Sequence, residues 1–325
     1  NLASEGISLM DIALKMFLIV TVPVLIGILL KNILSSFENI AKKISTVLFF
    51  LVLLGAVLAE RENVVSYVDV LTKKASVGNR VAIIGAGGMV GQKLVYKLLE
   101  PNFNAFNIDE ICLFDLYLPK YKDNRIRRVI GTVENSEILK EFSSERFGLI
   151  FYLASIVSGE AEENFEKGWN VNFFSMWKFL SALKVEHLNS SRKYIPKVIF
   201  TSSIAVFGSP FPDKIDDEFL CSPQTSYGAQ KASIEILISD FSRKGFINGI
   251  SLRLPTICVR PGKPNKAASG FFSNIIREPL NGKKAYLPVD PSVRHWHASP
   301  RSAVNFLIHA VSLETFQLEN RRSLN

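Results

Sequence analysis

Three side chains in the middle of the chain have the types and spacing needed to take a proton from an alcohol. Tyr227 and Lys231 are four positions apart, so on a helix they share one face. A phenol has a pKa of about 10, and a neighbouring ammonium lowers it by favouring the phenolate. We therefore predict that Tyr227 is a general base whose charge Lys231 stabilises. Ser203 ends the strand-like run KVIFTSS and is placed to hydrogen-bond the same hydroxyl. Alone, this spacing fits an exposed helix with an incidental pair better than a catalytic site.

The segments that would position these residues alternate between strand and helix from Val81 onward, which predicts a Rossmann-type, doubly wound parallel α/β sheet. VAIIGAGGMVGQKLVYKLLE gives a buried strand, a glycine turn and an amphipathic helix. Gly85 permits a tight turn, Gly88 lets the backbone approach a pyrophosphate, and Gly91 lets the helix pack on the strand. The N-terminus of the helix then offers free N–H groups to phosphates. The pattern predicts a dinucleotide site.

Three polar residues follow the predicted strands. Asp115 ends EICLFD, where an acid accepts hydrogen bonds from the adenosine ribose and repels a 2′-phosphate, which favours NAD over NADP. The alternative is a loop Asp that caps the next element. Ser155 ends FGLIFYLAS, near the expected nicotinamide half of the cofactor. Asn172 lies inside the next predicted helix, where it would bind backbone or join a proton relay through water, unless it serves only in helix packing.

Composition narrows the classes of partner. The net charge is +8, but Lys and Arg are scattered rather than gathered in a basic stripe with interleaved aromatic residues, so we expect no nucleic-acid partner. Small anions or a membrane surface suit this charge better. The three cysteines show neither a disulfide framework nor the spacing of a metal site, which favours a reducing compartment and no metal.

Residues 1–74 have a different composition from the rest. Leu9–Leu30 and Ile44–Ala59 are long apolar runs, and about 20 apolar residues span a bilayer core, so two transmembrane helices are predicted within residues 9–59. Two buried helices of a soluble bundle are the alternative. The Lys-rich loop between the runs favours the cytoplasmic side, and two crossings would then put the rest of the chain outside, where dinucleotide cofactors are scarce. We expect a cytoplasmic catalytic domain, and we interpret residues 75–80 as a junction between unrelated coding pieces.

Two resemblances are carried by these stretches. MDIALKMFLIVTVPVLIGILLKNI and FENIAKKISTVLFFLVLLGAVLAERENVV resemble about two helices of the bile acid:sodium symporter family, too few to enclose a transport path. From about Asn79 onward, the glycine turn, Asp115, LAS at 153–155, Asn172, TSSIAVFG and YGAQK resemble the extended short-chain dehydrogenases/reductases, the NAD-dependent epimerase/dehydratase superfamily. VSGEAE, AVFGSPFP, PQTSYGAQK, VRPGKPNKAASGFFSNIIREPL and VDPSVRHWHASPRSAVN are similar to the D-erythronate dehydrogenase branch.

This resemblance implies an NAD-dependent enzyme with Ser203, Tyr227 and Lys231 as its catalytic residues, and a homodimer is compatible with it. The cofactor-binding residues that it implies are Gly85, Gly88, Met89, Val90, Gly91, Asp115, Leu153, Ala154, Ser155, Asn172, Tyr227, Lys231 and Pro255. The substrate-binding residues that it implies are Ser158, Ser203, Arg260, Asn265 and Arg294. Lys263 is a further candidate to bind a substrate carboxylate, although salt bridges on the surface or between lobes would explain these cations equally well. His295 and His297 are interpreted as structural.

The sequence also departs from the family pattern. Thr132 stands where many relatives carry an Asp that contacts adenine, and Tyr152 replaces the usual His of the fourth strand. The chain stops at Asn325, before such a substrate lobe is expected to be complete.

Together these observations predict a cofactor-binding domain over 81–253 and a partial substrate lobe over 254–325. The predicted reaction is NAD-dependent oxidation of the C2 hydroxyl of a small anionic sugar acid, similar to D-erythronate, to the 2-keto acid. A nucleotide-sugar epimerase or dehydratase with the same triad is the first alternative. A non-catalytic, membrane-associated fragment is the second.

Overall fold

A computed structural model describes residues 79–325, except 104 and 319–320. The predicted segment 1–74 and almost all of the junction at 75–80 lie outside the described residues, and the two predicted transmembrane runs lie there too. Across the described part of the chain, every helix is too short or too polar to cross a bilayer.

Seven parallel strands form the main sheet, in the order β3-β2-β1-β4-β5-β6-β9. Their bounds are β1 Arg80–Ile84, β2 Glu110–Asp115, β3 Ile126–Ile130, β4 Leu149–Tyr152, β5 Lys197–Ser203, β6 Asn248–Leu254 and β9 Ser323–Leu324. The chain builds outward from β1 in both directions, so the strand order reverses between β1 and β4. In an open α/β sheet, ligands bind at the carboxyl ends of the strands beside such a reversal. The predicted parallel α/β fold is confirmed.

Helices connect the strands. The α-helices are α4 Met89–Leu98, α5 Ser136–Ser144, α6 Ser158–Glu163, α7 Phe165–Gly168, α8 Ser175–Asn189, α9 Ser226–Arg243, α10 Phe271–Leu280 and α11 Pro300–Ser312. One turn of π-helix, η2 Trp169–Phe174, joins α7 to α8, and the 3-10 turns are η3 Ile204–Val206, η4 Ala268–Gly270 and η5 Thr315–Leu318. A second, two-stranded parallel sheet pairs β7 Thr256–Ile257 with β8 His297–Ala298.

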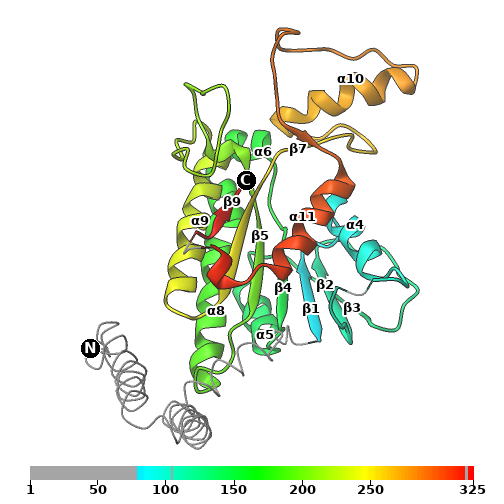
Figure 1. Ribbon diagram of the computed structural model, residues 1–325. Helices are drawn as coiled ribbons and strands as arrows, with labels where there is room; N and C mark the ends of the chain where they lie inside the picture. Colours follow the sequence, from blue (N-terminus) through cyan, green and yellow to red (C-terminus); the bar gives the residue numbers. More distant parts are fainter. Residues whose placement is uncertain (1–78, 104, 319–320) are drawn as a thin grey trace, which may run out of the picture. The chain divides into compact units, whose positions relative to one another are not determined.

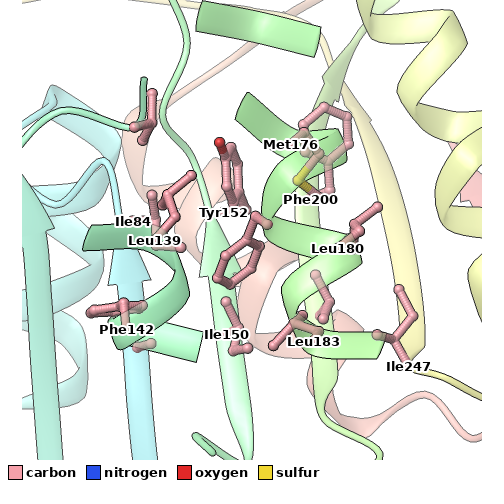
Figure 2. Close-up of a cluster of buried hydrophobic side chains, with 14 of the residues drawn as sticks. Ile84, Leu139, Phe142, Ile150, Tyr152, Met176, Leu180, Leu183, Phe200 and Ile247 are labelled. Atoms are coloured by element: carbon pink, nitrogen blue, oxygen red, sulfur yellow. The ribbon is translucent and has the colours of Figure 1, made fainter. Parts of the chain in front are cut away.

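The central strands are almost continuously apolar because both faces of the sheet are covered. All four residues of β4, LIFY, are buried. One core lies between the sheet and α5, α8 and α9, and the other lies between the sheet and α4 and α11 (Figure 1). Figure 2 shows the first core, in which Tyr152 stands among aliphatic and aromatic side chains. The Tyr152 hydroxyl pairs with the Ser175 hydroxyl at 2.9 Å, so the polar tip of this fully buried residue is satisfied.

Helix α9, which carries Tyr227 and Lys231, has a defined start and end. Its N-cap Thr225 accepts a hydrogen bond from the Gly228 amide at 3.1 Å. The Glu162 carboxylate accepts one from the Ser226 amide at 2.9 Å, and this negative charge suits the positive end of the helix dipole. Gly245 follows the helix with φ of +76°, a left-handed conformation that glycine adopts without strain.

The end of the chain differs from the predicted domain boundary, which placed all of 254–325 in the substrate lobe. Only the part around α10, β7 and β8 stands away from the sheet at its carboxyl end (Figure 1). Helix α11 returns to the sheet with Val304, Leu307 and Ala310 buried in the second core. Burying Leu307 alone stabilises this packing by roughly 1.5–3 kcal/mol. Strand β9 then pairs with β6, Ser323 opposite Ser251.

Candidate active site

The glycine turn after β1 has three positions that no other residue fits, and one of them was not predicted: a Cβ on Gly87 would lie 2.0 Å from the Tyr117 oxygen. Gly85 has φ of +91°, and a Cβ there would lie 2.5 Å from the Ala154 nitrogen. A Cβ on Gly91 would lie 2.3 Å from the Gly85 oxygen. At Gly88, by contrast, a Cβ would meet only the Gly85 oxygen, at 3.4 Å. Two of the predicted glycines are thus required by packing, while Gly88 leaves an open approach to the backbone.

The N-terminus of α4 lies directly after this turn. Its N-cap Gly88 supplies no side-chain hydrogen bond, and the first turn contains no acidic residue. The first amides of a helix have no partner within it, so those of Met89 and Val90 remain available. Free N–H groups beside an open glycine cradle suit a pyrophosphate. These residues therefore fit the phosphate half of a dinucleotide.

Asp115 is held at the carboxyl end of β2 by two backbone amides. Its Oδ2 accepts a hydrogen bond from the Gly87 amide at 2.8 Å, and its Oδ1 accepts one from the Leu116 amide at 2.7 Å. Each oxygen keeps acceptor capacity for ribose hydroxyls. Thr132, at the predicted adenine position, accepts a hydrogen bond from the Glu134 amide at 3.2 Å in its own turn.

Asn172 lies behind the site in a buried network. Its Oδ1 accepts hydrogen bonds from the Ser155 hydroxyl and the Ile156 amide, both at 2.9 Å. Its Nδ2 donates to Gln230 Oε1 at 2.7 Å. Asn172 was predicted to bind the cofactor or to bind backbone and relay protons. The structure shows backbone binding, and Asn172 does not line the cavity described below.

Lys231 is 2% exposed and donates a hydrogen bond to the Thr201 carbonyl at 2.8 Å. Its Nζ lies 4.6 Å from the centre of the Phe200 ring and 5.5 Å from that of Tyr227. Burial lowers the pKa of Lys231 to about 7, and the charge of Glu235 opposes that change. The lysine is therefore poised between its two protonation states near neutral pH.

Tyr227 differs from the sequence-based expectation in one respect. Burial raises the pKa of its phenol above the usual value, while the neighbouring Ser155 hydroxyl and the Arg260 charge act in the opposite direction. The predicted lowering of this pKa by Lys231 is not seen in the protein alone, because desolvation outweighs the Ser155 hydrogen bond and the Arg260 charge. Ser203 accepts a hydrogen bond from the Ala205 amide at 3.1 Å, so its hydroxyl proton is left to donate elsewhere.

All three predicted catalytic residues line one cavity of about 1140 Å³. Its walls come from the carboxyl ends of β4, β5 and β6, the start of α4, the loop at 211–215 and the lobe around α10. The predicted residues that line it are Met89, Val90, Leu153, Ser155, Ser158, Ser203, Tyr227, Lys231, Pro255, Arg260, Asn265 and Arg294. Gly85, Gly88, Gly91, Asp115, Ala154, Asn172 and Lys263 lie outside its lining.

A family model described as the NAD dependent epimerase/dehydratase family matches residues 81–299. The chain belongs to this family. A D-erythronate dehydrogenase of Haemophilus influenzae is 42% identical over 250 residues, 76% of this chain and 76% of that protein. A second, of Cupriavidus necator, is 41% identical over 253 residues, 75% of this chain and 76% of that protein. A solved structure, "nucleoside-diphosphate-sugar epimerase from Agrobacterium tumefaciens", is 47% identical with a TM-score of 0.70, over 75% of this chain and 72% of that one.

These matches confirm the predicted extended short-chain dehydrogenase/reductase family and an NAD-dependent enzyme. The glycine cradle and Asp115 agree with NAD as the cofactor. The resemblance of residues 1–74 to a symporter remains a prediction.

The lobe around α10 supplies cations to the cavity. Arg260 and Arg294 line it, and neither guanidinium forms an ion pair with another described residue. Burial lowers the pKa of Arg260, whereas Tyr227 raises it. Both arginines are thus available to an anionic ligand. Ser158 joins this lobe to the main domain, since its Oγ accepts a hydrogen bond from the Ala268 amide at 3.0 Å.

Sequence reasoning missed Arg277, a third arginine of the cavity. It is 9% exposed and donates to the Arg260 carbonyl at 2.7 Å and to Asn274 Oδ1 at 2.6 Å, while Glu278 balances its charge at 2.7 Å. Arg277 lies inside a helix and belongs to no recognisable sequence motif. The only sequence signal was its spacing of one helical turn from Asn274, which allows the two side chains to form a hydrogen bond. His295 and His297, predicted to be structural, pack on Phe272 with ring centres 4.6 and 4.5 Å away. No group of three His, Cys, Asp or Glu side chains that suits a metal ion occurs in the described part of the chain.

Proposed function

We propose that this enzyme uses NAD to oxidise the C2 hydroxyl of a small sugar acid, of the D-erythronate kind, to the 2-keto acid. The observation that carries the proposal is the cavity itself, which is lined by Ser203, Tyr227 and Lys231 from the main domain and by Arg260 and Arg294 from the lobe. A proton acceptor and an anion site in one cavity match a substrate that has both an alcohol and a carboxylate. The D-erythronate dehydrogenase relatives support the same class of substrate.

In this proposal, Ser203, Tyr227 and Lys231 carry out the proton transfer. The Ser203 hydroxyl, already accepting a hydrogen bond from Ala205, donates to the substrate oxygen and orients it. Tyr227 removes the hydroxyl proton, helped by the positive charges of Lys231 and Arg260. NAD, when bound, supplies the acceptor for the hydride that leaves C2.

Residues of the lobe around α10 bind most of the substrate in this proposal. Arg260 and Arg294 bind the carboxylate, since a guanidinium fork matches its two oxygens. Ser158 and Asn265 hydrogen-bond the remaining hydroxyls. Arg277 holds the main chain of Arg260 in place through its 2.7 Å hydrogen bond.

The cofactor-binding residues are also proposed. The backbone of Gly85, Gly88 and Gly91 with the Met89 and Val90 amides would hold the pyrophosphate, and Asp115 the adenosine ribose. Leu153, Ala154, Ser155 and Pro255 would surround the nicotinamide half, with Lys231 and Tyr227 on its ribose. Asn172 would support Ser155 from behind.

The proposed domain organisation is a membrane segment over 1–74 and a catalytic part on the cytoplasmic side. Ser76–Asn325 forms one compact unit, which supports a boundary at the predicted junction.

A nucleotide-sugar epimerase is the second candidate, because the 47% identical structure is of a nucleoside-diphosphate-sugar epimerase and the cavity is large for a four-carbon acid alone. The test is NADH formation by the full chain supplied with NAD and a panel of four-carbon sugar acids, with UDP-sugars in parallel. We expect NADH with 2-hydroxy sugar acids only. Inversion of a UDP-sugar without NADH release would replace the first proposal by the second.

A further inference from the structure

A buried carboxylate that the proposed reaction does not use lies one helical turn beyond Lys231. Glu235 is on α9 and is 4% exposed. It does not line the cavity, so it touches neither substrate nor cofactor. Tyr227, Lys231 and Glu235 occupy successive turns of one helix face, because each is four positions from the next.

This carboxylate is held by two neighbouring strands. Arg253 on β6 donates from Nε to both oxygens of Glu235, at 3.2 and 3.1 Å, and from Nη2 to Oε2 at 2.9 Å. Ser202 on β5 donates from its hydroxyl to Oε1. Both partners are buried, 8% and 3% exposed. Charge-assisted bonds of this kind fix the position of the carboxylate.

The same piece of β5 also holds the lysine. Ser202 directly follows Thr201, whose carbonyl accepts the hydrogen bond from Lys231 at 2.8 Å. The other close neighbours of the ammonium are the rings of Phe200 and Tyr227, and no salt bridge joins Lys231 to a carboxylate of the described residues. A buried ammonium without a directly bonded counter-ion loses its proton readily.

We propose that Glu235 is a positioning residue for Lys231, whose fixed carboxylate keeps the buried ammonium protonated and ready for the reaction. The proposal rests on the function proposed above, in which Lys231 acts as a cation. Burial lowers the pKa of Lys231 to about 7, and Glu235 is the charged group that raises it. The titratable groups that face this network are Tyr227 on the lysine side and Cys221 and Asp217 on the Arg253 side.

The direct test is the titration of Lys231 in the full chain without cofactor. NMR of lysines labelled with ¹³C at Cε follows it, and the resonance is assigned by its absence in Lys231→Met. Glu235→Gln should lower the titration midpoint by about 1 to 3 pH units, the effect of losing a nearby opposite charge. Asp240→Asn is the matched control, because it removes a carboxylate of the same helix whose partner, Arg243, is exposed.

Glu235→Gln leaves Arg253 buried with a single unpaired charge and risks the fold. The double variant Glu235→Gln/Arg253→Met removes both charges and decides the question. We expect the lowered midpoint in both variants and the wild-type midpoint in the control. In the activity profile, the loss of rate with rising pH should move to lower pH in the same two variants.

A folded double variant in which Lys231 titrates at the wild-type midpoint would overturn the proposal, because the pair would then be structural only. Loss of the fold in the double variant would count against it in the same way. The NMR titration needs no substrate, so its result stands even if the enzyme does not oxidise sugar acids.

Discussion

Lys231 donates a hydrogen bond to the Thr201 carbonyl at 2.8 Å, so the ammonium is tied to the end of β5 beneath the catalytic hydroxyls. An ammonium has three N–H donors. With Thr201 as its acceptor among the described residues, two N–H donors remain for a bound ligand. The lysine therefore acts on Tyr227 through space, across the 5.5 Å to its ring centre.

Replacing Tyr227 by Phe should remove the proton acceptor and leave the cavity intact. We expect the rate of sugar-acid oxidation to fall by about 10² to 10⁴-fold, the usual contribution of general acid–base catalysis. NAD binding, measured by calorimetry, should change little. A variant that keeps more than half of its activity would show that another group is the base.

Lys231→Met should stabilise the protein while inactivating it. The folded pKa of about 7 lies below the ordinary lysine value of 10.5, so the folded chain binds fewer protons than the unfolded chain between these two values. Stability of the native protein therefore rises with pH across that window, and the destabilisation by the buried charge is fully present below it. The variant should melt several degrees higher than wild type at about pH 6, with the difference shrinking toward about pH 10. A constant difference at both pH values would contradict this.

Asp115→Asn should relax the choice between NAD and NADP. The amide keeps an acceptor for the Gly87 N–H, which Ala would lose, but removes the charge that repels a 2′-phosphate. We expect NAD to be strongly preferred by wild type and the preference, measured as the ratio of kcat/KM values, to fall in the variant. Asp109→Asn, on the exposed surface before the same strand, is the control. Equal use of both cofactors by wild type would contradict the proposed role of Asp115.

Arg260→Leu should weaken binding of the sugar acid. A hydrogen bond to a charged group contributes about 1.5–3 kcal/mol, so KM should rise by roughly 10- to 100-fold. Arg294→Leu should act in the same direction and more weakly, because Arg294 is exposed. The exposed Arg301→Leu on α11 should leave KM unchanged. Unchanged KM values in both cavity variants would place the carboxylate elsewhere.

The local parts of this site were predictable from the sequence. Gly91 and Asp115 lie where strand, turn and helix patterns placed them, because each is fixed by neighbours in the same βαβ unit. Gly85 lies in the same turn, although its closest contact is Ala154, after β4. The Tyr227–Lys231 pair depends only on helical spacing. Such features need no knowledge of the tertiary fold.

The parts that depend on distant segments were not predictable. Asn172 donates to Gln230, 58 positions away, and accepts a hydrogen bond from the Ser155 hydroxyl. Burial of Tyr227 reversed the expected direction of its pKa. Arg277 lies on α10 and lines the cavity only because the chain folds the lobe against it. Helix α11 packs on the sheet because its apolar face is buried there.

Asn172→Ala should loosen the end of β4. The Ser155 hydroxyl and the Ile156 amide would lose their acceptor, and Gln230 its donor, at a cost of about 1–3 kcal/mol for buried groups left unpaired. Thermal unfolding should show a lower Tm and kcat should fall, whereas Asn189→Ala on the exposed side of α8 should change neither. An unaltered Tm would mean that water replaces the amide without loss.

The central claim is that a hydrogen leaves C2 of a sugar acid whose oxygen sits between Ser203 and Tyr227. The most direct measurement uses a four-carbon sugar acid deuterated at C2, with NAD and the full chain, and analyses the reduced cofactor by mass spectrometry. The account predicts one deuterium in the NADH formed, a slower reaction than with the unlabelled acid, and a rate of NADH formation about 10² to 10⁴-fold lower with Tyr227→Phe. NADH without deuterium, or equal turnover by Tyr227→Phe, would contradict it.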